Sequence, residues 1–181
     1  MIILNERKNR YSPELIARYR KIEPATIGHL LEFGFIDAEI HPLFPPGVVV
    51  GPAFTVRTAP QDSTIVHLAI DLAQRGDVLL IDRSGDRTHA PWGGMTALAA
   101  SLNGIAAVII DGVATDLSEM QDAGTPVFCR GGCARFGAPG RDKAFGVSRY
   151  RETVSARAVI DVPPYSVIGY IRSEWLHRYP P

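Results

Sequence analysis

The chain has little cysteine, no excess of either charge and no long apolar run. Cys129 and Cys133 are the only cysteines among its 181 residues, and they can build neither a four-ligand zinc site nor a disulfide framework by themselves. Two free thiols in a reducing compartment is the simpler expectation. Lys plus Arg and Asp plus Glu number 19 each, so the charge balance points to neither nucleic acid nor an anionic membrane as a partner.

The N-terminal residues do not resemble a targeting segment. Glu6, Arg7 and Lys8 follow the first apolar residues too closely for a signal peptide or a membrane span. We therefore expect a cytoplasmic protein.

Several catalytic motifs are also missing. The sequence contains no phosphate-loop pattern, no complete Gly-x-Gly-x-x-Gly and no Gly-x-Ser-x-Gly elbow. Its histidines form no i, i+4 pair and no His-Glu-x-x-His signature, and only His89 lies near the candidate site described below. These absences argue against nucleotide triphosphate, dinucleotide and serine-hydrolase chemistry.

What is present is the composition of a globular domain. Apolar residues make up 46% and charged residues 21% of the chain, and a domain of this length buries about 70% of its unfolded surface. No repeat or low-complexity linker divides it. We predict a single compact domain over residues 1–181, with an N-terminal helical extension at 1–25 and a C-terminal segment at 131–181 in which the clean alternation ends.

Apolar runs and segments of helical period alternate along the chain, which is typical of an α/β domain with a mixed sheet. Ser63 is the expected cap of one helix. Gly51-Pro52 interrupts one strand and indicates a sheet edge or a bend. The predicted helices span residues 13–21, 26–32, 64–74, 93–103 and 117–123, and the predicted strands span 48–56, 78–82, 108–111 and 126–129.

The first candidate site is the glycine-rich start of the predicted helix at 93–103. The first N–H groups of a helix have no partner inside it and carry partial positive charge, so they can bind carboxylate or phosphate. Gly93 and Gly94 would let a ligand approach the backbone closely. The alternative is a plain tight turn before a helix.

The second candidate is Asp116, which follows the strand ending at Asp111. A carboxylate just beyond the carboxyl end of a strand lies where open α/β sheets place ligands, and it can bind Mg²⁺ or Mn²⁺. The spacing from Asp116 to Glu119 is equally that of a capping box for the helix at 117–123. The residues themselves do not decide between these interpretations.

Five segments occur in an order and spacing that resemble the regulator of ribonuclease activity A family. This family includes the class II 4-hydroxy-4-methyl-2-oxoglutarate and 4-carboxy-4-hydroxy-2-oxoadipate aldolases, formerly misannotated as demethylmenaquinone methyltransferases. The resemblance covers residues 26–130, and the segments that carry it are 51–56 (GPAFTV), 76–82 (GDVLLID), 90–94 (APWGG), 104–112 (GIAAVIIDG) and 126–128 (PVF).

The resemblance implies a swivelling β/β/α domain that forms a trimer or a dimer of trimers, with active sites between subunits. It implies that a pyruvyl group rests on the backbone amides of Gly93, Gly94, Met95 and Thr96. It further implies that Asp116 binds a divalent metal, Mg²⁺ or Mn²⁺. The expected reaction is cleavage of a carbon–carbon bond in a small 2-oxo acid to release pyruvate, including decarboxylation of oxaloacetate.

Two regions depart from the family pattern. Thr115 stands where the family's Asp-Gly-x-x-Arg-Asp segment has an arginine, and one neutral hydroxyl replaces two charge-assisted bonds. Arg83, Arg87 and Arg130 are the candidate substitutes. The C-terminal residues also lack the family's Pro-Gly-Asp turn and Asp-rich final strand.

The leading prediction is therefore a metal-dependent lyase with Thr115 and Asp116 as catalytic residues. The alternative is a non-catalytic regulator that binds a ribonuclease or another protein, because the family's namesake inhibits a ribonuclease by contact. A third interpretation is a related enzyme in which Thr115 suits a substrate without the second carboxylate.

Overall fold

The computed structural model describes residues 2–4, 7, 11–31, 34–45, 47–134 and 154–157. These residues form a mixed seven-stranded sheet in the order β1-β7-β3-β4-β5-β6-β2. Strands β3 to β6 run parallel to one another, whereas β7 is antiparallel to β3 and β2 is antiparallel to β6. The strands are β1 (Ile2–Leu4), β2 (His41–Pro42), β3 (Ala53–Arg57), β4 (Val78–Asp82), β5 (Ala107–Asp111), β6 (Val127–Cys129) and β7 (Val154–Arg157).

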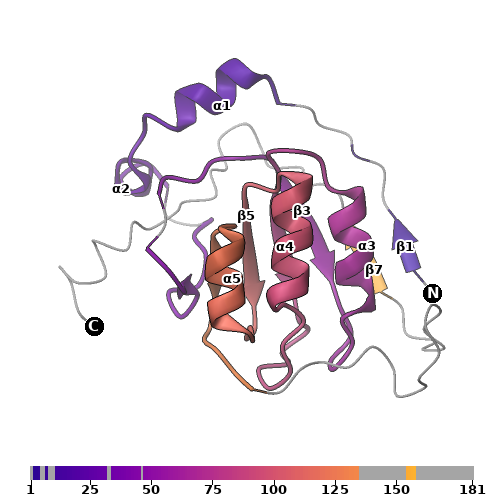
Figure 1. Cartoon of the computed structure of the whole chain (residues 1–181). Coiled ribbons are helices and arrows are strands. Elements are labelled where there is room, and N and C mark those ends of the chain that lie inside the picture. Colours follow the sequence, from indigo (N-terminus) through magenta and orange to yellow (C-terminus); the bar gives the residue numbers. More distant parts are fainter. Residues whose placement is uncertain are drawn as a thin grey trace.

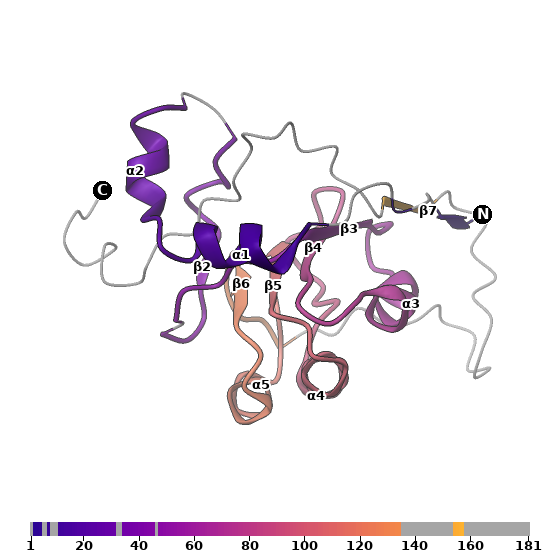
Figure 2. The same cartoon turned by 90° about the horizontal axis from the view of Figure 1, so that it is seen from above.

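Three helices cover one face of the sheet. Figures 1 and 2 show α3 (Thr64–Leu72), α4 (Gly94–Asn103) and α5 (Leu117–Ala123) side by side on that face. The N-terminal helices α1 (Pro13–Tyr19) and α2 (Pro24–Gly28) contain no buried residue. Strands β3, β4 and β5 are each followed by a helix on the same face, which confirms the predicted α/β fold with a mixed sheet.

The core follows the two-residue period of the strands. In β4 and β5 one set of side chains, including Leu79, Ile81, Val108 and Ile110, packs under the helices. The alternate residues face the opposite side, in a smaller cluster of Val78, Ala107, Ile109 and Phe128 against Ile36, Ile40 and Val49. Burial on both faces explains why these strands are continuous apolar runs.

The predicted strand at 48–56 is shorter than expected and lies inside the sheet. It begins at Ala53, and β3 pairs with both β4 and β7, so the edge interpretation is wrong. Gly51 occurs where a Cβ would collide with the carbonyl oxygen of Gly76. The carbonyl of Pro52 accepts a hydrogen bond from the N–H of Val78 at 2.7 Å, which joins the start of β3 to β4. The bend before β3 therefore serves close packing of two backbones.

Two helix predictions also need correction. The helix expected at 26–32 is α2, which begins at Pro24 because proline suits a first helical turn, and ends at Gly28. Ser63 precedes α3 but makes no side-chain cap. The carboxylate of Asp62 accepts from the N–H of Thr64 at 2.8 Å instead.

No helix in the described ranges is long and apolar enough to cross a membrane. Most of the predicted C-terminal segment at 131–181 lies outside the described residues.

Candidate functional site

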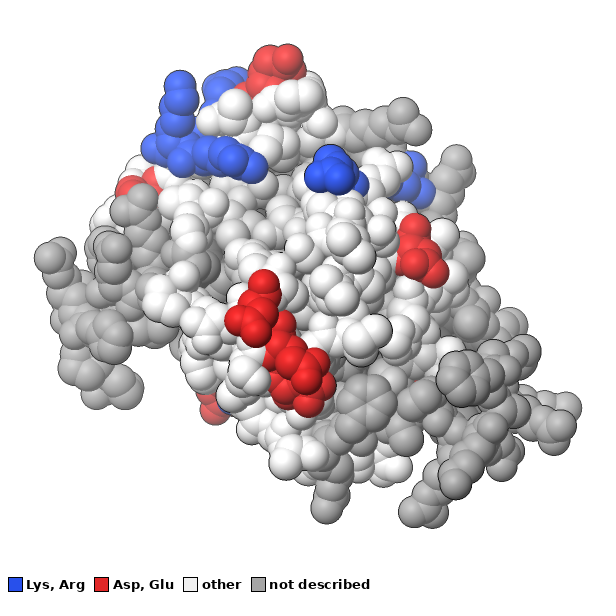
Figure 3. Space-filling view, in the orientation of Figure 1, with Lys and Arg blue, Asp and Glu red and all other residues white. Residues whose placement is uncertain are grey.

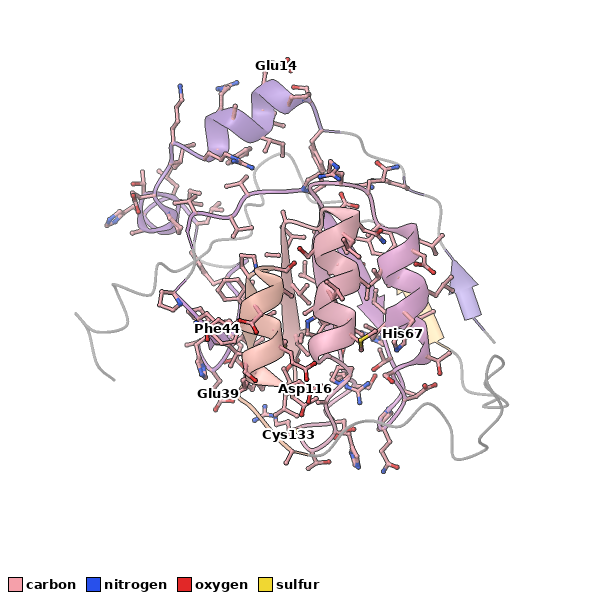
Figure 4. All side chains as sticks on the ribbon, in the orientation of Figure 1. Glu14, Glu39, Phe44, His67, Asp116 and Cys133 are labelled. Atoms are coloured by element: carbon pink, nitrogen blue, oxygen red, sulfur yellow. The ribbon has the colours of Figure 1, made fainter. Side chains whose placement is uncertain are left out.

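The candidate site lies at the carboxyl end of the parallel strands, where the loops after β4, β5 and β6 meet. The N–H of Thr115 donates to the carbonyl of Trp92 at 2.9 Å, and the N–H of Cys133 donates to the carbonyl of Ala114 at 2.8 Å. Figure 4 shows Asp116 and Cys133 together at this end of α4 and α5. This is the edge at which open α/β sheets place their ligands.

Gly93 and Gly94 bring the start of α4 against the loop after β5. A Cβ on Gly93 would collide with the Asp116 carboxylate, and one on Gly94 would collide with the side chain of Glu119. The N–H of Gly93 donates to the Thr96 hydroxyl at 2.9 Å, and that hydroxyl donates to the Gly93 carbonyl at 2.9 Å. The glycines are therefore required by close approach between loops, which a plain turn would not need.

Asp116 does not act as the predicted cap of α5. Its backbone has φ +55° and ψ +49°, the left-handed conformation, and its side chain makes no capping hydrogen bond. Asparagine and aspartate tolerate this conformation better than most residues. The carboxylate turns toward α4, where its Oδ2 accepts from the N–H of Gly94 at 3.2 Å. The capping-box interpretation with Glu119 is therefore wrong.

Thr115 lies beside this contact and is 9% exposed. Its hydroxyl donates to Oδ1 of Asp116 at 3.3 Å, and its methyl group faces Gly93. The structure thus brings Gly93, Gly94, Thr115 and Asp116 together. The hydroxyl of Thr96 is already hydrogen-bonded within the turn, to Gly93. The side chain of Met95 is 75% exposed.

The N–H groups of Met95 and Thr96 come before the first intrahelical hydrogen bond, which Ala97 makes to the carbonyl of Gly93 at 3.0 Å. Helical geometry leaves them without a backbone acceptor inside α4. They are therefore the backbone donors that the helix start offers to an anionic group.

Arg83, the first candidate substitute for the family arginine, is buried and already bound. Its guanidinium donates to the Thr58 hydroxyl at 2.5 Å, to the carbonyl of Asp62 at 2.5 Å and to Oδ2 of Asp86 at 3.2 Å. Burial lowers the pKa of Arg83, an effect that the charges of Asp86 and Asp62 oppose. Arg83 therefore holds the loops after β3 and β4 together and is not free to bind a substrate.

Arg130 and Arg87, the other two candidate substitutes, are bound to carboxylates. Arg130 donates to Asp111 at 2.6 Å, to Asp37 at 2.6 Å and to Glu39 at 2.5 Å. Hydrogen bonds to Asp111 and Asp37 raise the pKa of Arg130 above its usual range. Arg87 donates to Glu39 at 3.1 Å. Both arginines connect the segment before β2 to the loops at the end of the sheet. Arg83, Arg87 and Arg130 are therefore all bound elsewhere, and none of them replaces the family's arginine.

Asp116 and Glu119 carry carboxylate oxygens, the donor atoms that hard divalent cations prefer. Asp116 and Glu119 are exposed, and no group of at least three His, Cys, Asp or Glu side chains able to hold a metal occurs within the described ranges. Mg²⁺ commonly binds through one or two carboxylates and retains several waters. Asp116 could therefore hold Mg²⁺ or Mn²⁺ only if water filled most of the metal's other positions.

Sequence reasoning missed Asp86, the most heavily hydrogen-bonded carboxylate near the site. It accepts from the backbone N–H groups of Gln61, Thr88 and His89 at 2.8, 2.9 and 3.2 Å. The Asp-x-Thr spacing is a local turn signal that could have suggested the bond from Thr88. The bond from Gln61 joins separate loops and has no local signal.

Known proteins resemble this chain in sequence. A protein named "Putative 4-hydroxy-4-methyl-2-oxoglutarate aldolase" from Halalkalibacterium halodurans is 35% identical over 119 residues, which cover 65% of this chain and 57% of that protein. Protein DlpA of Legionella pneumophila is 28% identical over 127 residues, 66% of this chain and 21% of DlpA. The chain thus spans less than two thirds of these relatives' lengths.

Solved structures share the fold. Streptomyces coelicolor RraAS2, described as an unusual member of the RNase ES inhibitor RraA family, matches with a TM-score of 0.63 at 20% identity and covers 82% of this chain and 73% of its own. A Thermus RNA-processing inhibitor RraA matches with a TM-score of 0.53 at 21% identity, over 59% of this chain and 64% of its own. At such identities the likeness shows the fold alone.

The sequence model of one family matches residues 28–162, which include every strand from β2 to β7 and the whole candidate site. That family is the RraA-like family, described as Aldolase/RraA. The chain therefore belongs to the RraA-like family.

Proposed function

We propose that the protein is a divalent-metal-dependent lyase that cleaves a carbon–carbon bond of a small 2-oxo acid and releases pyruvate. The reaction is of the 4-hydroxy-4-methyl-2-oxoglutarate aldolase or oxaloacetate decarboxylase type. One observation carries the proposal: the exposed Asp116 carboxylate lies 3.2 Å from the N–H of Gly94, at the start of α4. A carboxylate of the kind that binds divalent metals thus lies beside a helix start of the kind that binds anions, which supports the proposal.

The chain's residues would divide the work as follows. Asp116 would hold Mg²⁺ or Mn²⁺, which when bound withdraws electrons from the 2-oxo acid. The backbone N–H groups of Met95 and Thr96 would hold the carboxylate of the pyruvyl group, because those of Gly93 and Gly94 already donate to Thr96 and Asp116. The hydroxyl of Thr115, which lies 3.3 Å from Oδ1 of Asp116, would orient the Asp116 carboxylate. Backbone donors fixed by a helix need little rearrangement as charge develops.

The test is pyruvate release by the purified full chain. We expect release from 4-hydroxy-4-methyl-2-oxoglutarate or oxaloacetate with Mg²⁺ or Mn²⁺, and its loss after chelation, because the enolate has no other comparable source of stabilisation in the proposed site. A lactate dehydrogenase coupled assay measures it, with the uncatalysed rate of oxaloacetate decay in the same metal as the control. Rates equal to that background with both substrates would contradict the proposal.

Thr115 favours a second candidate, a non-catalytic regulator that binds a ribonuclease or another protein. A neutral hydroxyl stands in the family's arginine position, and Arg83, Arg87 and Arg130 are bound elsewhere. The Streptomyces and Thermus proteins of this fold carry ribonuclease- or RNA-processing-inhibitor names. Binding of a purified endoribonuclease that persists after chelation would support this candidate.

The third interpretation, an enzyme for a smaller substrate, predicts activity only with 2-oxo acids that lack the second carboxylate.

The outer face of α4 leads us to infer that copies of the chain associate. The helix GMTALAASLN has no charged residue, and Met95, Leu98 and Leu102 are 75%, 46% and 73% exposed along one stripe. Figure 3 shows this face as largely uncharged over α4. An exposed apolar patch of this kind marks an interaction site.

A second copy is the proposed occupant, in a homotrimer or a dimer of trimers. We expect sedimentation velocity of the wild-type chain to give one of these masses. Leu102→Glu should shift the protein toward monomer, because it places a charge in the stripe that the inferred interface would bury. The matched change Asp122→Lys, on the charged surface of α5, should leave the mass unchanged. A wild-type monomer at micromolar concentration would contradict the inference.

A further inference from the structure

Asp86 and His89 form a hydrogen-bonded pair in the loop that leads from β4 to the site. Nδ1 of His89 lies 3.1 Å from Oδ2 of Asp86 and 2.9 Å from the hydroxyl of Thr88. The Asp86 side chain is 5% exposed and that of His89 is 19% exposed. None of the described residues gives Nε2 a hydrogen-bond partner, so one nitrogen is held and the other is available.

Asp86 is placed to remain a carboxylate. Burial raises its pKa, but the N–H groups of Thr88 and Gln61, the Thr88 hydroxyl and the His89 N–H donate to it and together hold that pKa well below its ordinary value. Arg83 adds a guanidinium 3.2 Å from Oδ2. A carboxylate can only accept, so His89 must donate Nδ1–H to it. That assignment leaves the lone pair of the neutral ring on Nε2.

The path of the loop brings His89 to the rim of the candidate site. One residue before it, the carbonyl of Thr88 lies 3.8 Å from Sγ of Cys133, whose N–H donates to Ala114. Three residues after it, the carbonyl of Trp92 accepts from the N–H of Thr115. Residues 88–92 are thus attached at Trp92 to the segment that leads into Asp116, and at Thr88 to Cys133, which itself bonds to that segment.

The charged and titratable groups around His89 come from two loops. Arg83 donates to the His89 carbonyl at 3.3 Å, on the backbone side of the residue, and Asp86 occupies Nδ1. Cys133 comes from the loop after β6 and contacts Thr88. None of these contacts involves Nε2.

We propose that His89, oriented by Asp86, is the proton carrier of the site and accepts and returns a proton through Nε2. This inference rests on the proposed lyase function. In a 4-hydroxy-2-oxo acid, Nε2 takes the proton of the 4-hydroxyl group, the carbon–carbon bond breaks, and its electron pair becomes the pyruvate enolate. The imidazolium then gives that proton to the enolate carbon, which becomes the methyl group of pyruvate. The proton taken from the hydroxyl group is the one returned to the enolate, so the reaction needs no further acid or base.

The test follows the last step in reverse, without any cleavage. Pyruvate and Mg²⁺ are incubated with the wild-type full chain in D₂O, and ¹H NMR records the loss of the methyl signal as its protons exchange. We expect His89→Ala to slow this exchange by about 100-fold or more, the usual scale of acid–base catalysis. Added imidazole should restore part of the rate. His67→Ala, which removes an exposed histidine on α3, should exchange at the wild-type rate.

A second measurement needs neither metal nor activity. Long-range ¹H–¹⁵N NMR of the metal-free wild type should show the His89 ring protonated on Nδ1 when neutral, with its signals identified by their absence in His89→Ala. A ring protonated on Nε2 would overturn the inference. Unchanged exchange in His89→Ala, or a loss that imidazole does not restore, would also overturn it, because either result removes the proton-carrying role.

An active wild type whose exchange does not depend on His89 overturns this inference alone. A wild type that neither exchanges the pyruvate methyl protons nor releases pyruvate from either substrate overturns the proposed lyase and the role of His89 together.

Discussion

Replacing Asp116 with asparagine should reduce metal-dependent pyruvate release by about 10²–10³-fold or more, the loss seen when one preorganised group is removed from an active site. Asparagine has nearly the same shape and tolerates the left-handed backbone at φ +55°. It also keeps an oxygen that can accept from the N–H of Gly94. What it loses is the negative charge that would hold the metal, so the change tests the site and not the fold. The ratio kcat/KM from the coupled assay measures the effect.

Asp122→Asn is the matched control for this change. Asp122 is exposed on the same helix, α5, and its removal alters the net charge by the same amount. We expect wild-type activity from it, and Asp116→Asn should unfold within about 1 kcal/mol of the wild type. Equal activity of Asp116→Asn and the wild type would remove Asp116 from the reaction.

Replacing Arg83 with methionine should cost about 3–5 kcal/mol in the free energy of unfolding, the usual loss when one partner of a buried pair is removed. The guanidinium is fully buried, and its donors serve Thr58, Asp62 and Asp86 from loops after two different strands. Methionine fills much of the volume but leaves these acceptors without their donor. Urea unfolding monitored by circular dichroism measures the loss.

Arg57→Met provides the comparison at the surface. Arg57 donates to Asp82 at 2.7 Å, but the two side chains are 65% and 40% exposed, so we expect a loss of at most about 1 kcal/mol. Similar losses for the two variants would show that burial of the Arg83 network does not determine its contribution.

Much of the fold could be predicted because its signals are local. The strand at Val78–Asp82 and the helix at Leu117–Ala123 have the predicted bounds, since each is a distinct apolar run or helical period between clear breakers. Helix α4 ends at Asn103 as predicted, where Gly104 adopts φ +73°. The sheet position of β3 could not be predicted, because it depends on pairing with β7, about a hundred residues further along the chain.

The sequence alone determined the composition of the site: two glycines before a helix, an aspartate after a strand, and a threonine in the family's arginine position. It could not determine the direction of the Asp116 side chain, for which a cap on α5 and a site residue were equal alternatives. The tertiary structure excluded the cap, because the left-handed backbone at Asp116 aims the carboxylate at Gly94 of a different helix. It also showed that Arg83, Arg87 and Arg130 are held by other loops. Such contacts depend on how separate loops meet in space, and no local pattern of residues encodes them.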